Sequence, residues 1–332
     1  MKALVYTNTK EVVFRDEPDP IVEAGEVLIK VEATGICGSD MHAYHGLDPR
    51  RVPPLILGHE VAGTIVGGPE KGSRVVINPL ITCGACSYCD TGFSNFCDDR
   101  ELIGMRLAGA YAEYVKIPTQ NIIPIPDKLG WVQAALAEPT ATALHALNLA
   151  RLKSSRPLAE LEVMVIGGGA IGMLVSLLLK GYGCYDVLLA ETNDLRGQSA
   201  ASHTGCKVFN PITEQTGQDN SFDLVMDCVG GGKTRDLAMA AVKPGGTMVH
   251  IGLMDSEGSL DIRKLTLFEI TLLGVYCYTA ADVRAAVKAL DTGLLGDLSW
   301  VETRPLSEGA KAFSDLDKGL TAAAKIVLVP GQ

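Results

Sequence analysis

Four cysteines within one short segment have the spacing of a zinc site. Cys83, Cys86, Cys89 and Cys97 form the pattern C-x2-C-x2-C-x7-C. Four thiolates complete a tetrahedral shell around zinc, which is the arrangement of structural sites. Disulfides between cysteines so close together in sequence would be strained. The pattern therefore predicts a zinc ion that stabilises a lobe of the fold and takes no part in chemistry.

A second set of metal-binding side chains is spread over the first 140 residues. It consists of Cys37, the adjacent pair His59 and Glu60, and Glu138. Thiolate, imidazole and carboxylate ligands together leave a coordination position for water or substrate, as in catalytic zinc sites. Taken singly, Cys37 could be a core thiol and His59 an ordinary loop histidine. Their combination indicates a second, catalytic zinc.

A glycine motif indicates a dinucleotide site. Gly167, Gly169 and Gly172 form G-x-G-x-x-G between a short apolar run and a helical segment, where such glycines allow a tight turn and close approach of a diphosphate. Glu191 ends the next apolar run, and a carboxylate there would bind ribose hydroxyls and repel a 2′-phosphate. We therefore expect NAD rather than NADP, and we expect Arg196 to face solvent.

Length and composition limit the class of protein. A chain of 332 residues suggests about two domains. The formal charge of −10 argues against binding to nucleic acid, which needs clustered positive charge. No apolar stretch approaches the roughly 20 residues that cross a bilayer, and the N-terminus lacks the pattern of a secretory signal. We expect a cytoplasmic protein with reduced cysteines and no membrane or nucleic-acid partner.

The order of the expected elements indicates an α/β fold. Residues 1–125 contain short strand-like runs separated by glycine and proline, and Trp131–Ala150 is expected to be helical with a restart at Pro139. From Leu161 onward, strands alternate with helices, which is typical of a doubly wound parallel sheet. The last strand-like run, Lys325–Val329, is expected to return to the first domain.

The motifs occur in an order that is similar to a known family. C-G-S-D-x-H at 37–42, G-H-E-x-x-G at 58–63, the four cysteines, Glu138-Pro139 and the glycine motif resemble the zinc-dependent medium-chain dehydrogenase/reductase (alcohol dehydrogenase) family. Within that family, the glutamate at 138 resembles the polyol (sorbitol) and threonine dehydrogenase branch.

The resemblance implies a two-domain architecture. A GroES-like, β-rich, zinc-binding catalytic domain would comprise 1–149 and 281–332, and a Rossmann NAD-binding domain would comprise 150–280. It also implies a homodimer or homotetramer, for which Ile270–Val275 is a candidate edge strand.

The resemblance also implies roles for individual residues. Cys37 and His59 match ligands of the catalytic zinc, and Glu60 and Glu138 match carboxylates that ligate or approach it. Which of the two carboxylates binds directly is open. Ser39 matches the hydroxyl that hydrogen-bonds the substrate alcohol and His42 matches the relay that passes its proton to solvent; both count with the ligands as catalytic residues. Thr142 matches a position beside the nicotinamide. Asp40 either orients the loop or is a plain turn residue.

These roles imply hydride transfer between a small secondary alcohol and NAD, with two zinc ions per chain. A polyol, sugar-derived or hydroxy-acid substrate is the leading hypothesis, a threonine-like 3-hydroxy substrate is the second, and a catalytically silent NAD-binding scaffold is a distant third. Arg50, Arg51 and Arg106 are candidates for holding a substrate carboxylate or phosphate, since arginine suits planar anions, but a solvated surface position is the favoured interpretation for each.

Overall fold

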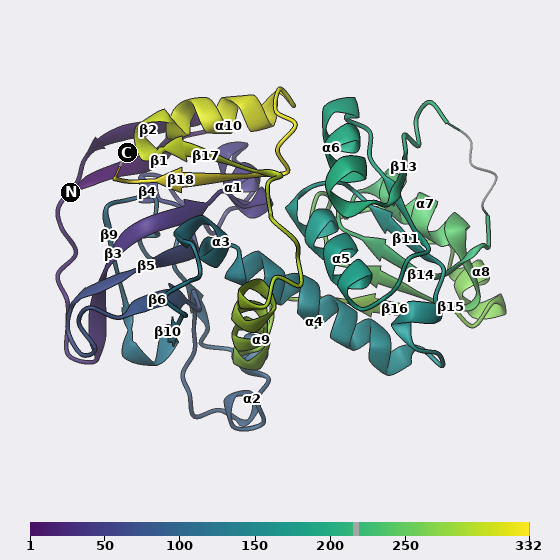
Figure 1. Cartoon of the computed structure of the whole chain (residues 1–332), viewed down its shortest axis with the longest axis horizontal. Helices are drawn as coiled ribbons and strands as arrows, with labels where there is room; N and C mark the ends of the chain where they lie inside the picture. The colour runs from purple at the N-terminus through teal and green to yellow at the C-terminus, as the bar shows by residue number, and fades with distance from the viewer. Residues whose placement is uncertain (215–218, 332) are drawn as a thin grey trace.

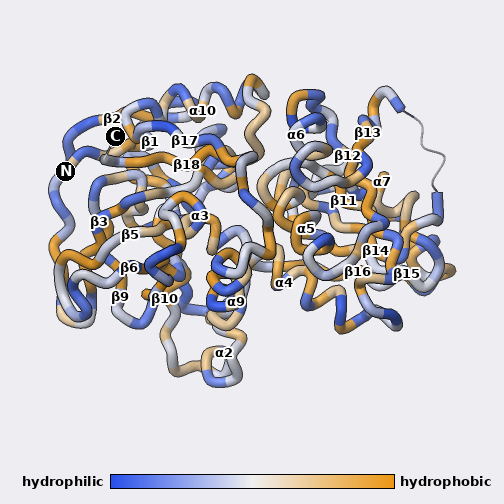
Figure 2. The backbone as a smooth tube through the Cα atoms, viewed as in Figure 1, coloured by the Kyte–Doolittle hydropathy of each residue, from blue (hydrophilic) through white to orange (hydrophobic). Residues whose placement is uncertain are grey.

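The computed structural model describes residues 1–214 and 219–331 and shows two halves joined by a long helix (Figure 1). Helix α4 (Ala137–Lys153) runs from one half to the other, and α9 (Ala280–Asp291) packs against it. The hydrophobic stretches follow the interior strands of both halves, as Figure 2 shows for β18 and β11. Among the described residues, no helix is both long enough and apolar enough to cross a membrane.

The first half is built mainly from antiparallel strands, in agreement with the expected β-rich region. A three-stranded sheet has the order β2-β1-β4, and a seven-stranded sheet has the order β10-β6-β5-β3-β18-β17 with β9 also paired to β3. Strands β7 and β8 form a separate pair. The strand bounds are β1 (Lys2–Asn8), β2 (Glu11–Asp16), β3 (Glu26–Gly35), β4 (Leu55–Ile56), β5 (Glu60–Gly67), β6 (Arg74–Ile77), β7 (Leu80–Ile81), β8 (Glu101–Leu102), β9 (Tyr114–Pro118), β10 (Ile122–Pro124), β17 (Val301–Pro305) and β18 (Lys325–Val329).

The pairing of β3 with β5 brings distant residues together. The two strands are antiparallel, and Gly35 at the end of β3 lies opposite Glu60 at the start of β5. The segments just outside this pair therefore meet at one end of the sheet. One of them begins the short helix α1 (Gly38–Tyr44).

The C-terminal strand adds to the same sheet. β18 pairs antiparallel with β3, through Val327 opposite Gly35, and runs parallel to β17. Helix α10 (Gly309–Asp317) connects β17 to β18. The tail thus lies against the N-terminal strands, while the exact domain division at 149/150 and 280/281 stays a prediction.

The second half is a six-stranded, entirely parallel sheet with the order β13-β12-β11-β14-β15-β16. This is the 3-2-1-4-5-6 order of dinucleotide-binding sheets, in which the ligand lies where the strand order reverses. The strands are β11 (Val163–Ile166), β12 (Val187–Ala190), β13 (Lys207–Phe209), β14 (Phe222–Asp227), β15 (Val242–His250) and β16 (Thr271–Gly274). The accompanying helices are α5 (Ala170–Gly181), α6 (Asp194–Thr204), α7 (Gly232–Ala241) and α8 (Ile262–Leu267).

The expected helix over Trp131–Ala150 is divided earlier than Pro139. Helix α3 (Trp131–Ala135) ends at Leu136, and α4 begins at Ala137. Pro139 therefore lies in the first turn of α4, where backbone N–H groups have no partner within the helix and a missing N–H costs nothing. The restart is real, but the proline lies just inside it.

Candidate metal and cofactor sites

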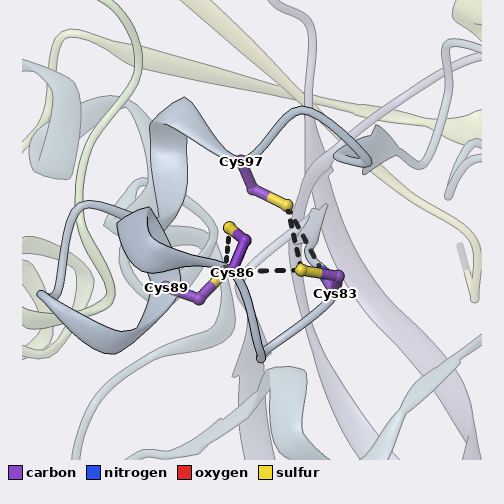
Figure 3. A group of neighbouring side chains, drawn as sticks. All are labelled: Cys83, Cys86, Cys89 and Cys97. Atoms are coloured by element: carbon purple, nitrogen blue, oxygen red, sulfur yellow. Dashed lines mark hydrogen bonds between the residues drawn. The ribbon is translucent and has the colours of Figure 1, made fainter.

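The four cysteines of the predicted structural site converge (Figure 3). The sulfur atoms of Cys86 and Cys89 are 3.5 Å apart, those of Cys83 and Cys97 are 3.6 Å apart, and those of Cys83 and Cys89 are 4.0 Å apart. A tetrahedral zinc with Zn–S bonds of about 2.3 Å requires sulfur–sulfur distances of about 3.8 Å. The donor geometry therefore fits a closed zinc shell.

Local structure gives these thiols their positions and favours ionisation of Cys83, whereas the pKa of Cys86 is raised to about 11. Cys86 is the N-cap of the short helix α2 (Ser87–Asp90), and Cys89 lies one turn later. Hydrogen bonds from the backbone N–H groups of Ala85 and Cys86 lower the pKa of Cys83 to about 7. A thiolate is the form that binds metal, so the backbone prepares the site.

The second predicted set forms a compact group at the β3–β5 junction. One donor atom each from Cys37, His59 and Glu60 lies within 4.8 Å of the others. Cys37 caps α1 directly after β3, whereas His59 and Glu60 lie at the start of β5. Gly35 makes this packing feasible, because a Cβ at that position would come within 1.9 Å of Glu60 Oε2.

Asp40 faces the imidazole of His59. Its Oδ1 is 3.6 Å from His59 Nδ1, which is longer than a hydrogen bond, and within the described chain both atoms are buried without a hydrogen-bond partner. Its Oδ2 accepts hydrogen bonds from the Tyr111 hydroxyl at 2.5 Å and from the Cys37 backbone N–H at 3.1 Å. A carboxylate facing Nδ1 leaves Nε2 for a metal, as is usual for metal-binding histidines. The bond from the Cys37 N–H favours the interpretation that Asp40 orients its loop over that of a plain turn residue.

Glu60 has a buried cationic partner that no sequence motif indicated. Lys325, the first residue of β18, donates from Nζ to both carboxylate oxygens, at 2.6 and 2.8 Å, and to the carbonyl oxygen of Ile36 at 2.8 Å. The Lys325 side chain is 1% exposed and that of Glu60 is fully buried. Burial alone would lower the pKa of Lys325, but Glu60 and Cys37 raise it above its usual range, so the lysine stays charged.

Glu138 lies nearby but outside the three-residue donor group. The hydroxyl of the buried Tyr278 donates to Glu138 Oε1 at 2.8 Å. Burial raises the pKa of Glu138 to about 8, with Glu60 and Cys37 adding to the effect and His59 opposing it. Glu60 is therefore close to the other donors but paired with a lysine, whereas Glu138 accepts a side-chain hydrogen bond at Oε1 alone among the described residues.

Arg51 is not the solvated surface arginine that was expected. Its side chain is 1% exposed and donates to Asp48 Oδ2 at 2.6 Å, to the carbonyl oxygen of Gly104 at 2.9 Å and to Ser39 Oγ at 3.2 Å. The free-energy cost of burying this guanidinium is offset because each of its nitrogen atoms has a hydrogen-bond acceptor. The presence of Asp48 three residues earlier is the feature of the sequence that could have predicted this ion pair. Arg51 thus fixes the hydroxyl of Ser39 and is unavailable to a substrate anion.

The other two arginines are closer to expectation. Arg50 is half-exposed and pairs with Asp48 through Nε at 2.8 Å, while Arg106 is exposed and pairs with Glu101 at 3.1 Å. His42 lies on α1 among these groups. Burial lowers the pKa of His42, and the neighbouring His45 and Arg51 lower it further.

The glycine motif occupies the turn between β11 and α5, where the strand order reverses. Gly167 has φ +97, and a Cβ there would come within 2.5 Å of Val229. A Cβ on Gly172 would come within 1.8 Å of the Gly167 carbonyl oxygen, so helix and turn require a glycine. Gly169, the N-cap of α5, faces open space that a side chain would fill. This open helix N-terminus fits a diphosphate.

Glu191 lies beside this turn, and Arg196 is paired with it. Glu191 accepts from the backbone N–H of Gly168 at 2.8 Å and from that of Asn193 at 2.7 Å. Arg196 Nη2 lies 3.1 Å from Glu191 Oε1 and its side chain is 28% exposed, so Arg196 faces solvent only in part and its pairing was not expected. Burial opposes ionisation of Glu191, but the contacts from Arg196, Asn193 and Gly168 together lower its pKa. Thr142 is half-buried on α4, one turn after Glu138.

Comparison with known families gives two matches. Residues 23–127 match the alcohol dehydrogenase GroES-like domain, and residues 170–292 match the zinc-binding dehydrogenase family. Together the matches cover more than half of the chain and include both cysteine groups and Glu191.

Curated relatives span most of the chain. A 2-dehydro-3-deoxy-L-galactonate 5-dehydrogenase from Pseudoalteromonas atlantica is 30% identical over 89% of either chain. A sorbitol dehydrogenase from Bacillus subtilis is 32% identical over 84% of this chain and 82% of the relative. An L-threonine 3-dehydrogenase from Pyrococcus abyssi is 32% identical over 80% of this chain and 79% of the relative.

A solved structure supports the same assignment over the whole length. L-idonate 5-dehydrogenase from Escherichia coli has a TM-score of 0.87 and 26% identity, covering 99% of this chain and 97% of the other. The fold, the order of the motifs and these matches lead to one conclusion: the chain belongs to the zinc-binding medium-chain dehydrogenase/reductase family, with a GroES-like domain and a Rossmann domain.

Proposed function

We propose that this protein is a zinc- and NAD-dependent dehydrogenase that transfers a hydride between a secondary alcohol and NAD, with a polyol or sugar acid as the alcohol. The carrying observation is the convergence of Cys37, His59 and Glu60 at one end of the β3–β5 pair. The relatives named above as sugar-acid and sorbitol dehydrogenases support the class of substrate.

Different residues of this site would bind the metal, orient the substrate hydroxyl and accept its proton. Cys37 and His59, with Glu60 or Glu138, would hold the zinc, which as a Lewis acid makes a bound hydroxyl more acidic. Ser39 Oγ accepts a hydrogen bond from Arg51, so its own O–H is oriented away from the guanidinium and toward a substrate or relay partner. His42 has a lowered pKa and is therefore neutral near pH 7, the form that accepts a proton.

The nucleotide would bind across the glycine turn. The open N-terminus of α5 at Gly169 would receive the diphosphate, Glu191 the adenosine ribose, and Thr142 would lie beside the nicotinamide.

The pairing of Glu191 with Arg196 makes the expected preference for NAD testable. Glu191→Ala should weaken the binding of NAD and leave Arg196 free to bind a 2′-phosphate. The ratio of NAD affinity to NADP affinity should therefore fall by about 10–100-fold, the range of one charge-assisted contact. Glu191→Ala combined with Arg196→Ala should lose the gain toward NADP. A preference for NADP in the unmodified protein would contradict this assignment.

The first experiment on function tests a panel of substrates, with the rate of NADH formation as the readout. It should contain sugar acids such as L-galactonate and L-idonate, the polyols sorbitol and xylitol, L-threonine, and simple secondary alcohols. Turnover on sugar acids or polyols supports the proposal. The similarity to a threonine dehydrogenase makes threonine the second candidate, and turnover on threonine alone would replace the first.

We further propose a cytoplasmic homodimer or homotetramer that pairs through β16. This strand ends the six-stranded sheet, and Leu272 on it is 40% exposed. A lysine on an edge strand hinders pairing. Light scattering on Leu272→Lys should therefore show smaller assemblies than on Leu195→Lys, an exposed position on α6. Equal masses for both variants would argue against this interface.

A further inference from the structure

The segment between β16 and α9 reaches the candidate catalytic site from the nucleotide-binding half. Its buried residue Tyr278 donates a hydrogen bond to Glu138 Oε1 at 2.8 Å. Holding one carboxylate oxygen limits the rotation of the group, which lies near enough to Cys37, His59 and Glu60 to feel their charges. Partners of this kind orient the side chains around a metal.

The same segment is held at its other end by the four-cysteine lobe. Asn95, which is fully buried, donates from Nδ2 to the carbonyl oxygen of Tyr276 at 3.1 Å. Arg100 donates from Nε to the Tyr276 hydroxyl at 3.2 Å, and its guanidinium lies 5.0 Å from the centre of the ring. In Figure 1 the lobe with α2 lies below α9, which begins shortly after this segment.

Arg100 connects this contact directly to the predicted structural zinc. Its Nη1 group donates to the carbonyl oxygen of Cys97 at 2.8 Å. One guanidinium therefore holds the backbone of a predicted zinc ligand and the hydroxyl of Tyr276 at the same time. Arginine suits this role because its donors are fixed in a planar fork.

The backbone between the two tyrosines shows that the segment is constrained. Cys277 has φ +50, a left-handed conformation that residues other than glycine rarely adopt. Such conformations persist where the surrounding structure holds the chain on both sides. Here the contacts at Tyr276 and Tyr278 are on either side of the constrained residue.

We propose that the four-cysteine lobe is a positioning element for Glu138, acting through Arg100 and Asn95 on Tyr276 and from there through Tyr278. Zinc in the lobe then does more than stabilise a loop, because it fixes the carboxylate beside the catalytic metal across the boundary between the two halves. This inference rests on the proposed catalytic zinc site.

The test uses the zinc-loaded protein and three variants. Tyr278→Phe removes the hydroxyl that reaches Glu138, Tyr276→Phe removes the hydroxyl that Arg100 reaches, and Arg100→Gln removes the guanidinium. Tyr185→Phe, the same change at an exposed tyrosine, is the matched control. The readouts are the rate at which pyridine-2,6-dicarboxylate removes each zinc, kcat and KM for the best substrate of the panel, and thermal stability.

Tyr278→Phe should release the catalytic zinc about 10–100-fold faster, the range for partners of metal ligands. Tyr276→Phe and Arg100→Gln should change the same rate in the same direction by a smaller factor, and lower kcat without changing KM for NAD. Thermal stability of Tyr276→Phe should match that of Tyr185→Phe, which separates positioning from a general loss of folding.

Two results would overturn the proposal. If Tyr278→Phe accelerates zinc release but Tyr276→Phe and Arg100→Gln both behave like Tyr185→Phe, the lobe is not coupled to Glu138. If all variants behave like the control while the unmodified protein binds two zinc ions and turns over substrate, Tyr278 does not position Glu138 and the proposed function stands. An unmodified protein with one zinc and no turnover refutes the proposed function itself, and this inference with it.

Discussion

The two predicted zinc sites differ in how the chain builds them. The four-cysteine lobe takes all its donors from one short loop, with Cys83 exposed, Cys86 and Cys89 partly exposed and Cys97 buried. The site at Cys37, His59 and Glu60 takes its donors from separate segments and surrounds them with buried partners, namely Asp40, Lys325 and Tyr278. A site of the first kind needs the metal to hold the loop, whereas a site of the second kind is held largely by the fold.

The largest expected difference between the sites is in catalysis. His59→Ala removes a ligand of the site with an open coordination position, so kcat should fall about 1,000-fold or more, because a Lewis acid contributes several kcal/mol to such a reaction. Cys37→Ser should act in the same way. Affinity for NADH, measured by fluorescence titration, should change little. His203→Ala on α6 is the control, and undiminished turnover in His59→Ala would refute the zinc assignment.

The buried partners of the second site should be costly to remove. Lys325→Met leaves the carboxylate of Glu60 buried without its cation, and breaking such a pair from one side costs about 3–5 kcal/mol. Denaturant unfolding of the chelator-treated protein measures this loss. Adding Glu60→Gln should recover most of the stability, because the uncompensated charge is gone. Equal stability of the single and double variants would mean that the charge of Glu60 is not the source of the loss.

Mutations in the four-cysteine lobe should lower the stability of the fold more than they lower turnover. Cys89→Ser opens the four-thiol shell, so zinc content should fall and the thermal midpoint should drop by about 4–8 °C, which corresponds to a loss of about 2 kcal/mol. Turnover at low temperature should survive in part. Elemental analysis and calorimetry check this prediction. A variant as stable as the parent, with its zinc content unchanged, would contradict the structural role.

The smallest expected effect on kcat comes from disturbing the Ser39 hydroxyl of the second site. Arg51→Lys keeps the charge but loses the planar fork that holds Ser39, Asp48 and Gly104, so kcat should fall about tenfold. Arg106→Lys, at an exposed position, should not change it. Steady-state kinetics on the best substrate compare the two. If both variants keep the parental kcat, Arg51 does not position Ser39.

The difference between a local site and a dispersed site also explains which features the sequence could predict. The cysteine spacing and the glycine turn are local, and the structure places both as their spacing indicated. The six-stranded parallel sheet followed from the alternation of apolar runs and helices. Each of these signals lies within a few dozen residues, where chain geometry limits the outcomes.

The partners of the dispersed site gave no such signal. Lys325 and Glu60 are 265 residues apart, and a lysine at the start of an apolar strand usually faces solvent. Tyr278 lies 140 residues from Glu138. Arg51 was expected at the surface because arginine usually lies there, yet it is buried and bonded to Gly104, 53 residues away. Tertiary packing decided the positions of Lys325 and Tyr278, whereas Asp48 gave a local indication of the pairing of Arg51.

The position of Lys325 has a consequence for synthesis on the ribosome. All four candidate ligands of the dispersed site are translated within the first 140 residues, but the cation that neutralises Glu60 lies on the last strand of the sheet. Domains generally begin to fold as they emerge, N-terminal first. Here the nascent β3–β5 pair would carry an uncompensated buried carboxylate while the whole parallel sheet is still being made. Completion of the site therefore waits for β18 to leave the ribosome, so translation arrested before residue 325 should leave a chain that cannot close this site.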